Sequence, residues 1–339
     1  MNSFRHDTLA QRILFGHGQC QEHLSKEVAE RESKSVLLIG STRWSFLARD
    51  LPIGAHIRTV HQHVPYHEVK LARELTRSNN VDLILSIGGG SATGLAKSVA
   101  LEVGISIIAV PTTFASSEAT PIWGITEAGR KVTGRDVRVL PKVVIYDSSL
   151  LSTLSPEFAS ASGFNALAHA IDALWAPNAD PISSATAEVG IRILVNSLPQ
   201  LVGDSPPLDD LLFGAYLSAT ALASAGSGLH HRICHALGGR FDLPHAYLHA
   251  CLLPHVLAFN LPYAPIAEAA LTRGFNSSDP VASLRGLCET LKTPTSLRQI
   301  GLHSSDLDEA TDLALEAVPS SNPRPIEFES MKALLKQAW

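Results

Sequence analysis

Polar side chains recur at helical spacing in the otherwise apolar second half of this chain. Asn165 and His169 stand four residues apart in GFNALAHAIDA, so both project from one face of an expected helix. His231 and His235 are four apart in a second helical stretch, and His245 follows ten residues after His235, beyond a Gly-Gly pair. An i, i+4 pair on each of two helices, with one further histidine in a loop, is a spacing that can build a metal site.

A hydrogen-bonded group of core histidines is the alternative interpretation, because a histidine on a helix is more often packed or exposed than a ligand. Nearby, His230, His249 and His255 are interpreted as packing or supporting residues. The sequence holds 15 histidines in 339 residues, and six of them fall between His230 and His255. Spacing and composition therefore mark this region as a candidate site without deciding whether it holds a metal.

A glycine-rich turn in the first half has the chemistry needed to hold a phosphate. Gly88-Gly89-Gly90-Ser91 follows an apolar run and opens a helical stretch. Glycines let the backbone approach a ligand closely, and the N–H groups at a helix start attract a pyrophosphate. A second polar turn, 111–118, follows the next expected strand, and ligands bind at strand ends in open parallel sheets. The two turns together favour a nucleotide site, although each alone could be a tight turn or a helix cap.

The elements that must position these groups differ between the two halves of the chain. Short β-branched runs predict strands at 35–40, 56–60, 82–88, 105–110 and 143–146, and helical spacing predicts a helix at 67–77. Near-continuous apolar strands separated by helices predict a parallel sheet covered on both faces. After residue 150, stretches such as 183–202 and 210–222 show helical spacing without strand-like alternation, which predicts an all-α second half.

The expected architecture is therefore α/β, with a Rossmann-like parallel-sheet domain at 1–150 that binds a nucleotide and an all-α domain at 151–339. Length supports two domains of roughly 150 residues each. The net charge of −5 and the pI near 6.3 argue against nucleic acid or a membrane surface as a partner. The four cysteines form no CxxC pair, and no apolar run resembles a signal peptide or a membrane helix. We expect a cytoplasmic protein.

Several longer motifs resemble the iron-containing alcohol dehydrogenase superfamily, which shares its architecture with dehydroquinate synthase, and within it the maleylacetate reductases. The resembling stretches cover nearly the whole chain: GGGSATGLAK at 88–97, PTTFASSEATPI at 111–122, LPKVVIYD at 140–147, SGFNALAHAIDAL at 162–174, GLHHRICHALGGRFDLPHA at 228–246, LKTPTSLRQIGL at 291–302 and NPRPI at 322–326. The resemblance implies an oxidoreductase that uses NADH or NADPH, with an active site in the cleft between the two domains, and commonly a homodimer.

The resemblance also implies cofactor contacts. The first turn would hold the pyrophosphate, and the second turn with one lysine would line the nicotinamide half, which involves Gly89, Gly90, Ser91, Thr112, Thr113, Ser116 and Lys131. Arg43 follows the strand at 35–40, in a turn without an acidic residue to hold a ribose 2′-hydroxyl, so both NADH and NADPH are expected to serve.

Metal-dependent members of the superfamily bind a divalent ion with one aspartate and three histidines. Those positions read Asn165, His169, His231 and His245 here. A neutral amide brings no charge to a divalent cation, and the maleylacetate reductases carry the same asparagine, so no catalytic metal is expected. Gly94 likewise replaces the aspartate that is usual in the helix after the glycine turn.

The implied reaction is the metal-independent reduction of the carbon–carbon double bond of maleylacetate, a dicarboxylate, to 3-oxoadipate in the degradation of aromatic compounds. The four residues at the former metal positions would stabilise an enolate. His245 would donate the proton, with His231 as the second choice. Lys131, Arg135 and Arg138 are candidate partners for the substrate carboxylates, although such residues are often only solvated.

Other functions stay open. A metal-dependent alcohol or polyol dehydrogenase of the same superfamily is one, and a lyase or cyclase of the dehydroquinate synthase type is another. A third is a repurposed biosynthetic member acting on a related enone or carbonyl compound, with Tyr247 and Leu248 reshaping the pocket where the reductases usually carry Glu-Thr. A catalytically inactive binding protein is the last, and the intact glycine, threonine and histidine motifs argue against it.

Overall fold

The chain forms two compact units in the computed structural model, which describes residues 3–127 and 130–339. The α/β unit spans Leu9–Thr153, and the helical unit takes Leu154–Trp339 together with the described residues up to Thr8. The chain therefore divides three residues beyond the expected position 150, and residues 3–8 group with the helices. One reason is a hydrogen bond at 2.8 Å between His6 Nδ1 and Asp180 Oδ2.

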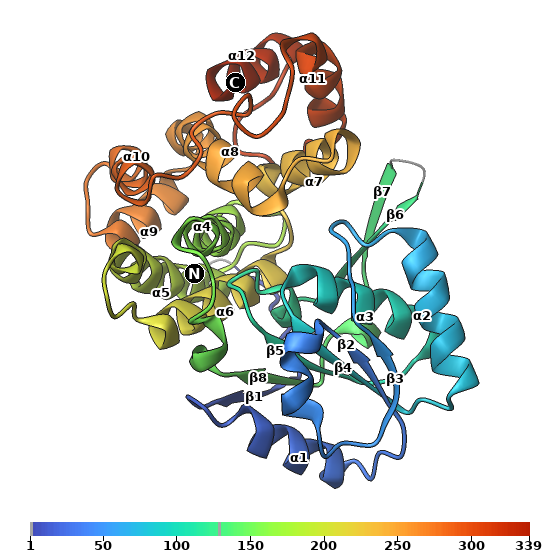
Figure 1. The fold of residues 1–339 in the computed structure, drawn as a ribbon. Coiled ribbons are helices and arrows are strands. Elements are labelled where there is room, and N and C mark those ends of the chain that lie inside the picture. The colour runs from blue at the N-terminus through green and yellow to red at the C-terminus, as the bar shows by residue number, and fades with distance from the viewer. Residues whose placement is uncertain (1–2, 128–129) are drawn as a thin grey trace. The chain divides into compact units, whose positions relative to one another are not determined.

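Among the described residues, six parallel strands form the sheet of the α/β unit (Figure 1). Their order is β1-β8-β5-β4-β2-β3, with the bounds β1 Arg12–Phe15, β2 Val36–Ile39, β3 Ile53–Ile57, β4 Leu83–Gly88, β5 Ile107–Pro111 and β8 Val143–Tyr146. The strands β2, β5 and β8 are buried at every residue. Strands covered on both faces have no exposed side, which explains why their sequences are unbroken apolar runs.

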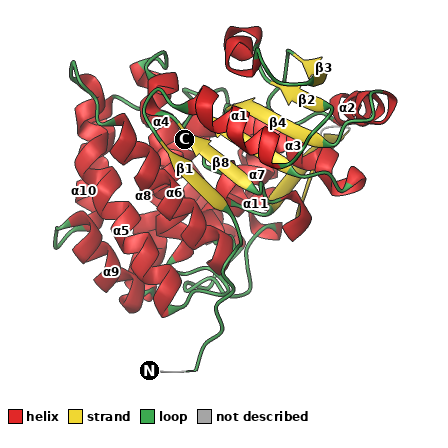
Figure 2. Ribbon diagram, turned by 90° about the horizontal axis from the view of Figure 1, so that it is seen from below, coloured by secondary structure: helices red, strands yellow, loops and turns green. Residues whose placement is uncertain are grey.

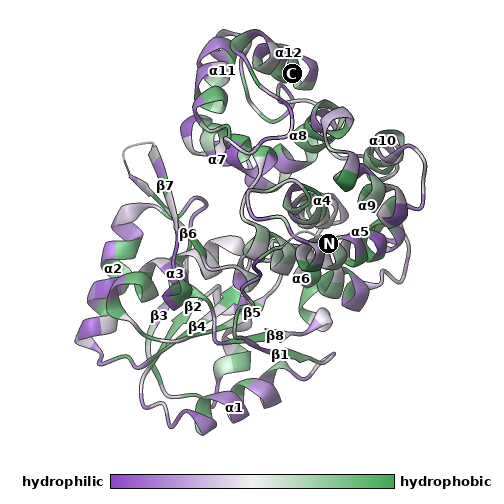
Figure 3. Cartoon of the chain, turned by 180° about the vertical axis from the view of Figure 1, so that it is seen from behind, coloured by the Kyte–Doolittle hydropathy of each residue, from purple (hydrophilic) through white to green (hydrophobic). Residues whose placement is uncertain are grey.

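Helices cover both faces of this sheet. α1 (Cys20–Glu30) lies on one face, and α2 (Tyr66–Ser78) and α3 (Gly90–Val103) lie on the other (Figure 1). Leu37 of β2 and Leu95 of α3 belong to one buried cluster on the second face. α1 and α2 mix hydrophilic with hydrophobic residues along their length (Figure 3), because each packs one side on the sheet and exposes the other. The parallel-sheet prediction is confirmed.

Four strands of this unit differ from the expectation. β3 begins three residues before the predicted 56–60, and β1 was not predicted at all. β1 has only four half-buried or exposed residues, and its extended form depends on pairing with the distant β8. The antiparallel hairpin of β6 (Ile122–Glu127) and β7 (Arg130–Arg135) was also missed. Its strands mix charged and apolar residues without a regular period, so sequence pattern alone does not mark them.

In the described part of the second unit, the regular elements are helices (Figure 2). The α-helices are α4 Pro156–Ala173, α5 Pro181–Ser197, α6 Leu208–Ala225, α7 Leu229–Phe241, α8 His245–Asn260, α9 Pro265–Phe275, α10 Pro280–Leu291, α11 Leu307–Glu316 and α12 Phe328–Ala338. The all-α prediction is thus confirmed. α4 is buried at every position from Ala159 to Ala173, so its polar residues lie in the interior of the unit. A search of the described helices finds none that is both long and apolar enough to cross a membrane.

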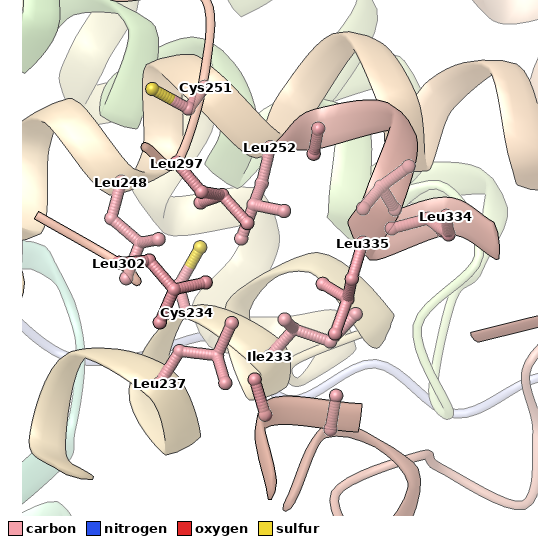
Figure 4. Close-up of a cluster of buried hydrophobic side chains, with 14 of the residues drawn as sticks. Ile233, Cys234, Leu237, Leu248, Cys251, Leu252, Leu297, Leu302, Leu334 and Leu335 are labelled. Atoms are coloured by element: carbon pink, nitrogen blue, oxygen red, sulfur yellow. The ribbon is translucent and has the colours of Figure 1, made fainter. Parts of the chain in front are cut away.

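An apolar cluster packs α7 and α8 against the C-terminal helices. Figure 4 shows Cys234 of α7 and Leu248 of α8 among leucines of this cluster. Leu248 is fully buried there, so the expectation that it reshapes a substrate pocket is wrong. Successive residues of a helix point in different directions, so the side chain of Tyr247, next to Leu248 in α8, is half-buried and still partly accessible.

Candidate active site

Three helices bring the predicted polar residues of the helical unit together. α4 carries Asn165 and His169 one turn apart, α7 carries His231, and His245 is the first residue of α8. The rings of His169 and His231 stack with their centroids 4.7 Å apart. The ring of His249 lies 4.8 Å from that of His231 and 4.5 Å from that of His245. The structure therefore groups the three predicted histidines around His249, which sequence reasoning assigned to a supporting role.

His235 lies at the margin of this group. Its ring centroid is 6.4 Å from that of His231 and 5.9 Å from that of His245, and its side chain is only half-buried. The i, i+4 spacing of His231 and His235 thus places them on one face of α7, where their rings meet edge to face at the longest of these centroid distances.

Asp172 is a residue of this site that sequence reasoning missed. Its fully buried carboxylate accepts a hydrogen bond from His231 Nδ1 at 3.0 Å and from Trp175 Nε1 at 2.9 Å. It also accepts the backbone N–H groups of His230 and His231, at 3.2 Å each. Burial raises the pKa of this carboxyl, but the hydrogen bond from His231 and the nearby histidines outweigh burial and lower the pKa below its ordinary value. Its place three residues after His169, on the same helical face, was the available signal.

The carboxylate of Asp172 determines which way His231 faces. Because Nδ1 points at a carboxylate, we assign the proton of the neutral ring to Nδ1, which leaves Nε2 as an acceptor. In the described structure, His231 Nε2 and Asn165 Oδ1 are buried and have no hydrogen-bond partner. Buried polar atoms are nearly always paired, so two unpaired ones mark the place where a ligand is expected to bind.

A second line of hydrogen bonds supports His245. His249 Nε2 lies 3.2 Å from His245 Nε2, and His249 Nδ1 lies 2.8 Å from His230 Nε2. Burial lowers the pKa of His230 to about 3 and that of His249 well below its ordinary value, so both rings are neutral at pH 7. His245 is therefore held by an uncharged partner, whereas His231 is held by a carboxylate.

His230, Cys234 and His249 also form a group of potential metal ligands, with their ligand atoms within 4.8 Å of one another. Two nitrogens bound to one tetrahedral zinc ion stand roughly 3.3 Å apart. The 2.8 Å between His230 Nε2 and His249 Nδ1 is instead the length of a hydrogen bond. Cys234 lies among leucines (Figure 4), which suits a thiol packed as a small apolar group. We infer that His230, Cys234 and His249 are buried core residues joined by hydrogen bonds and not a metal site.

Gly228 should not tolerate a side chain, because it precedes α7 directly against Asp172. A Cβ atom at this position would stand 2.4 Å from Asp172 Oδ1. We expect Gly228→Ala to lower the free energy of unfolding by about 1–3 kcal/mol, the usual cost of overpacking, measured by urea denaturation. Gly286→Ala is the matched control, since a Cβ there meets nothing within 4 Å. Equal stability of the two variants would contradict the close contact.

The α/β unit places the two polar turns side by side. Gly88 at the end of β4 pairs in register with Pro111 at the end of β5, and Thr112 N–H donates to the Gly88 carbonyl at 3.0 Å. Gly89 begins α3 without a side-chain cap, and a Cβ on it would stand 2.9 Å from Thr113 Cγ2. The first N–H groups of α3 are thus available to an anion, in a cradle that only glycine permits.

The second turn presents hydroxyl groups in a constrained backbone. Thr112, Thr113 and Ser116 are buried, and Ser116 has a φ of +54°, in the left-handed region. Ser116 Oγ donates to the Phe114 carbonyl at 3.1 Å. The half-buried Ser91 lies in the first turn of α3. These residues fit a nicotinamide dinucleotide, since the turns supply N–H and hydroxyl donors at adjacent strand ends.

The three predicted carboxylate partners all lie on or just beyond the β6–β7 hairpin. Lys131 and Arg135 lie on β7, with Lys131 half-buried and opposite Thr126. Arg138 is exposed, and its guanidinium binds Asp136 at 2.6 Å, so a carboxylate of the chain already holds it. The structure thus places Lys131 and Arg135 on the hairpin and Arg138 shortly after it. Their role toward a substrate stays a prediction.

Gly94 lies in α3 where the superfamily usually has an aspartate. A Cβ at Gly94 would stand 2.9 Å from Val64 Cγ2. Val64 has a φ of +53°, a strained value for a β-branched residue. The loop before α2 thus occupies the space that a side chain at position 94 would need.

A parallel-sheet unit with a glycine-rich turn at a strand end, together with a helical unit that holds a buried polar centre, is an arrangement typical of oxidoreductases that use a nicotinamide cofactor. Residues 10–148 match the family model for iron-containing alcohol dehydrogenase, and residues 159–339 match the model for the C-terminal part of that family. The chain belongs to the iron-containing alcohol dehydrogenase family, and it is an oxidoreductase. Within that family it is similar to maleylacetate reductases.

The similarity extends over the full length of those relatives. Maleylacetate reductase 1 of Cupriavidus pinatubonensis is 40% identical, with 100% of this chain and 98% of the relative covered. The maleylacetate reductase of Sphingobium indicum is also 40% identical, with 99% and 97% covered. Among solved structures, an iron-containing alcohol dehydrogenase from Corynebacterium glutamicum has a TM-score of 0.95 at 45% identity, covering 100% of this chain and 97% of that one. Maleylacetate reductase from Agrobacterium tumefaciens has a TM-score of 0.92 at 36% identity, covering 100% and 99%.

The family name implies iron, and the residues at the ligand positions fit that ion poorly. The donor set consists of three imidazoles and the amide of Asn165, without a carboxylate. Asp172 does not replace the missing charge, because His231 Nδ1 and the start of α7 already use its oxygens. A divalent cation bound by these four residues would lack the oxygen anion that hard cations prefer.

Proposed function

We propose that this protein reduces the carbon–carbon double bond of maleylacetate with NADH or NADPH, yielding 3-oxoadipate, without a catalytic metal. The full-length similarity to maleylacetate reductases supports the substrate. The observation that carries the proposal is that an amide, Asn165, replaces a carboxylate at the former metal positions, where buried Asn165 Oδ1 and His231 Nε2 have no partner in the described structure and mark the place of an expected ligand. The amide N–H groups of Asn165 and a His231 ring protonated beside Asp172 can donate to an organic oxyanion, whereas a divalent iron ion would lack a carboxylate ligand among the four residues.

Reduction of the carbon–carbon double bond requires one hydride and one proton, which are added to its two carbons. Bound NADH or NADPH supplies the hydride to the alkene carbon that is β to the ketone. Negative charge then develops on the ketone oxygen, where the Asn165 amide and His169 would donate hydrogen bonds. His231 would add positive charge when protonated, because the buried Asp172 carboxylate stabilises an imidazolium. His245 would donate the proton to the carbon adjacent to the ketone, which completes the saturated product.

The cofactor would be held by the two turns of the α/β unit, through Gly89, Gly90, Ser91, Thr112, Thr113, Ser116 and Lys131. The turn after β2 holds Arg43, whose exposed guanidinium lies over the ring of Trp44 at 4.7 Å. An exposed arginine there tolerates a 2′-phosphate, and the turn offers no carboxylate to select a 2′-hydroxyl. The proposal therefore includes both cofactors. Lys131, Arg135 and Arg138 are the proposed partners for the substrate carboxylates, and Arg138 also binds Asp136.

Chelator treatment tests the metal-free reaction directly. The purified protein, dialysed against a strong chelator, should oxidise NADH on addition of maleylacetate at the same rate as untreated protein. The reason is that no step of the proposed mechanism uses a metal. Simple aldehydes and ketones, which lack both carboxylates and the conjugated double bond, are the control substrates. Loss of activity that iron or zinc restores, or a preference for the simple carbonyls, would support a metal-dependent alcohol dehydrogenase instead.

A further inference from the structure

A lysine buried in the middle of α3 has no role in the site described above. Lys97 is 0% exposed. Its Nζ donates to the carbonyl of Ser117, to the carbonyl of Ile122 at 2.9 Å, and to the hydroxyls of Ser117 and Thr120 at 3.2 Å each. All of these acceptors lie within 117–122, a segment that begins with the last two residues of the second polar turn.

The segment 117–122, which Lys97 binds, continues the chain from that turn. It follows Ser116, whose backbone is in the left-handed region, and it contains the short 3-10 helix Ser117–Ala119. Its other side is held by Glu118, which accepts the Tyr146 hydroxyl at 2.8 Å through its carboxyl group and the Gln11 amide at 2.9 Å through its backbone carbonyl. The segment is therefore fastened from α3 on one side and from β8 on the other.

The cost of burying an ammonium group shows that Lys97 is more than a packing residue. An unpaired buried charge costs several kcal/mol, and this cost is offset only by good hydrogen bonds. Burial lowers the pKa of Lys97 to about 7, against the opposing effect of the Glu118 charge. An apolar side chain, as at the neighbouring Leu95 and Val99, would fill the same interior without this cost. Compared with an apolar side chain at this position, Lys97 contributes the hydrogen bonds from Nζ to segment 117–122.

We propose that Lys97 is a positioning residue of the cofactor site, which holds the second polar turn in register with the first. The inference rests on the proposed role of these turns in binding the nicotinamide cofactor. The same helix contributes to both turns. Gly89 of the first turn is the N-cap of α3, and Lys97, two helical turns further along α3, binds the end of the second turn. Lys97 thereby fixes the spacing between the N–H groups of the first turn and the hydroxyls of Thr112, Thr113 and Ser116.

The test is cofactor affinity, measured by fluorescence titration of the full chain with NADH in the absence of substrate. Lys97→Met should raise the Kd for NADH about tenfold, because a preorganised set of donors is released. The kcat at saturating NADH should change less than about twofold, since Lys97 touches no reacting atom. n-Propylammonium, which replaces the atoms lost in Lys97→Ala, should restore part of the affinity of that variant. Ser98→Ala is the control in the same helix, because within the described part of the chain the Ser98 hydroxyl donates to the Gly94 carbonyl and makes no other hydrogen bond.

The outcomes separate this inference from the proposed function. An unchanged Kd in folded Lys97→Met, or a kcat that falls while the Kd stays constant, would overturn it. If Lys97→Met does not fold, Thr120→Val removes one acceptor of Nζ with little change in volume and should raise the Kd about threefold. No change in that variant would also overturn the inference. Failure of the wild-type chain to bind either NADH or NADPH would instead contradict the proposed function.

Discussion

Asp172→Asn is expected to lower the kcat of maleylacetate reduction by about a thousandfold while the protein stays folded. An asparagine oxygen in the place of Oδ1 still accepts the His230 N–H and Trp175 Nε1, which keeps half of the cap. The amide nitrogen then stands in the place of Oδ2, where it faces the N–H and Nδ1 of His231 and donates where the carboxylate accepted. The neutral His231 ring then carries its proton on Nε2 and accepts at Nδ1, and it loses the carboxylate that stabilises its imidazolium, so it adds no positive charge at the enolate oxygen. Steady-state NADH oxidation and a thermal melt measure the two expectations together.

Asp180→Asn is the matched control for this variant. Asp180 is also buried, also binds a histidine ring (His6, at 2.8 Å) and also caps a helix, by accepting the N–H groups of Ile182 and Ser183. Its histidine is not among the predicted site residues, so its substitution should affect stability and leave kcat within about twofold. A folded Asp172→Asn variant with kcat within tenfold of wild type would show that the orientation of His231 is unimportant to the reaction.

His245→Ala is expected to lower kcat by about a hundredfold or more if His245 is the general acid, with little change in KM for maleylacetate. The reason is that water must then protonate the enolate carbon, whereas the binding groups remain. The residue is well placed for this role because His249, itself neutral, holds its ring through Nε2. Rates at saturating substrate and cofactor, with separate KM values for each, decide the point.

His255→Ala provides the comparison on the same helix. His255 lies further along α8, half-buried, and burial lowers its pKa without bringing it into the histidine group. We expect the kcat of the His255→Ala variant to stay near that of wild type. A His245→Ala variant that changes only KM would make His245 a binding residue. A larger loss in His231→Ala than in His245→Ala would transfer the proton-donating role to His231.

Much of the architecture was predictable because it depends on local periodicity. The strands at 82–88 and 143–146 and the helix at 67–77 agree closely with β4, β8 and α2. The elements that were missed depend on partners distant in sequence. β1 is extended because it pairs with β8, and the β6–β7 hairpin is held partly by Thr126, which donates to the His63 carbonyl at 2.7 Å. Neither contact leaves a repeating signal in the segment itself.

The candidate site divides in the same way. Residue types and helical spacing identified His169, His231 and His245, and the structure places these rings in one group. Sequence reasoning did not find Asp172 or Lys97, because each acts through a hydrogen bond to a residue at least twenty positions away. A buried aspartate or lysine in a sequence is indistinguishable from an exposed one until its neighbours are known.

The sequence by itself determined the family, the order of a parallel-sheet unit before a helical unit, the two polar turns and the asparagine at position 165. These properties follow from residue identity and from periods of a few residues, which survive without any knowledge of long-range contacts. The tertiary structure alone decided that Asp172 orients His231, that His249 supports His245, and that Leu248 belongs to the core. Each of these depends on the rotation of one helix against another, and that rotation is determined by the packing of the whole unit rather than by any one segment.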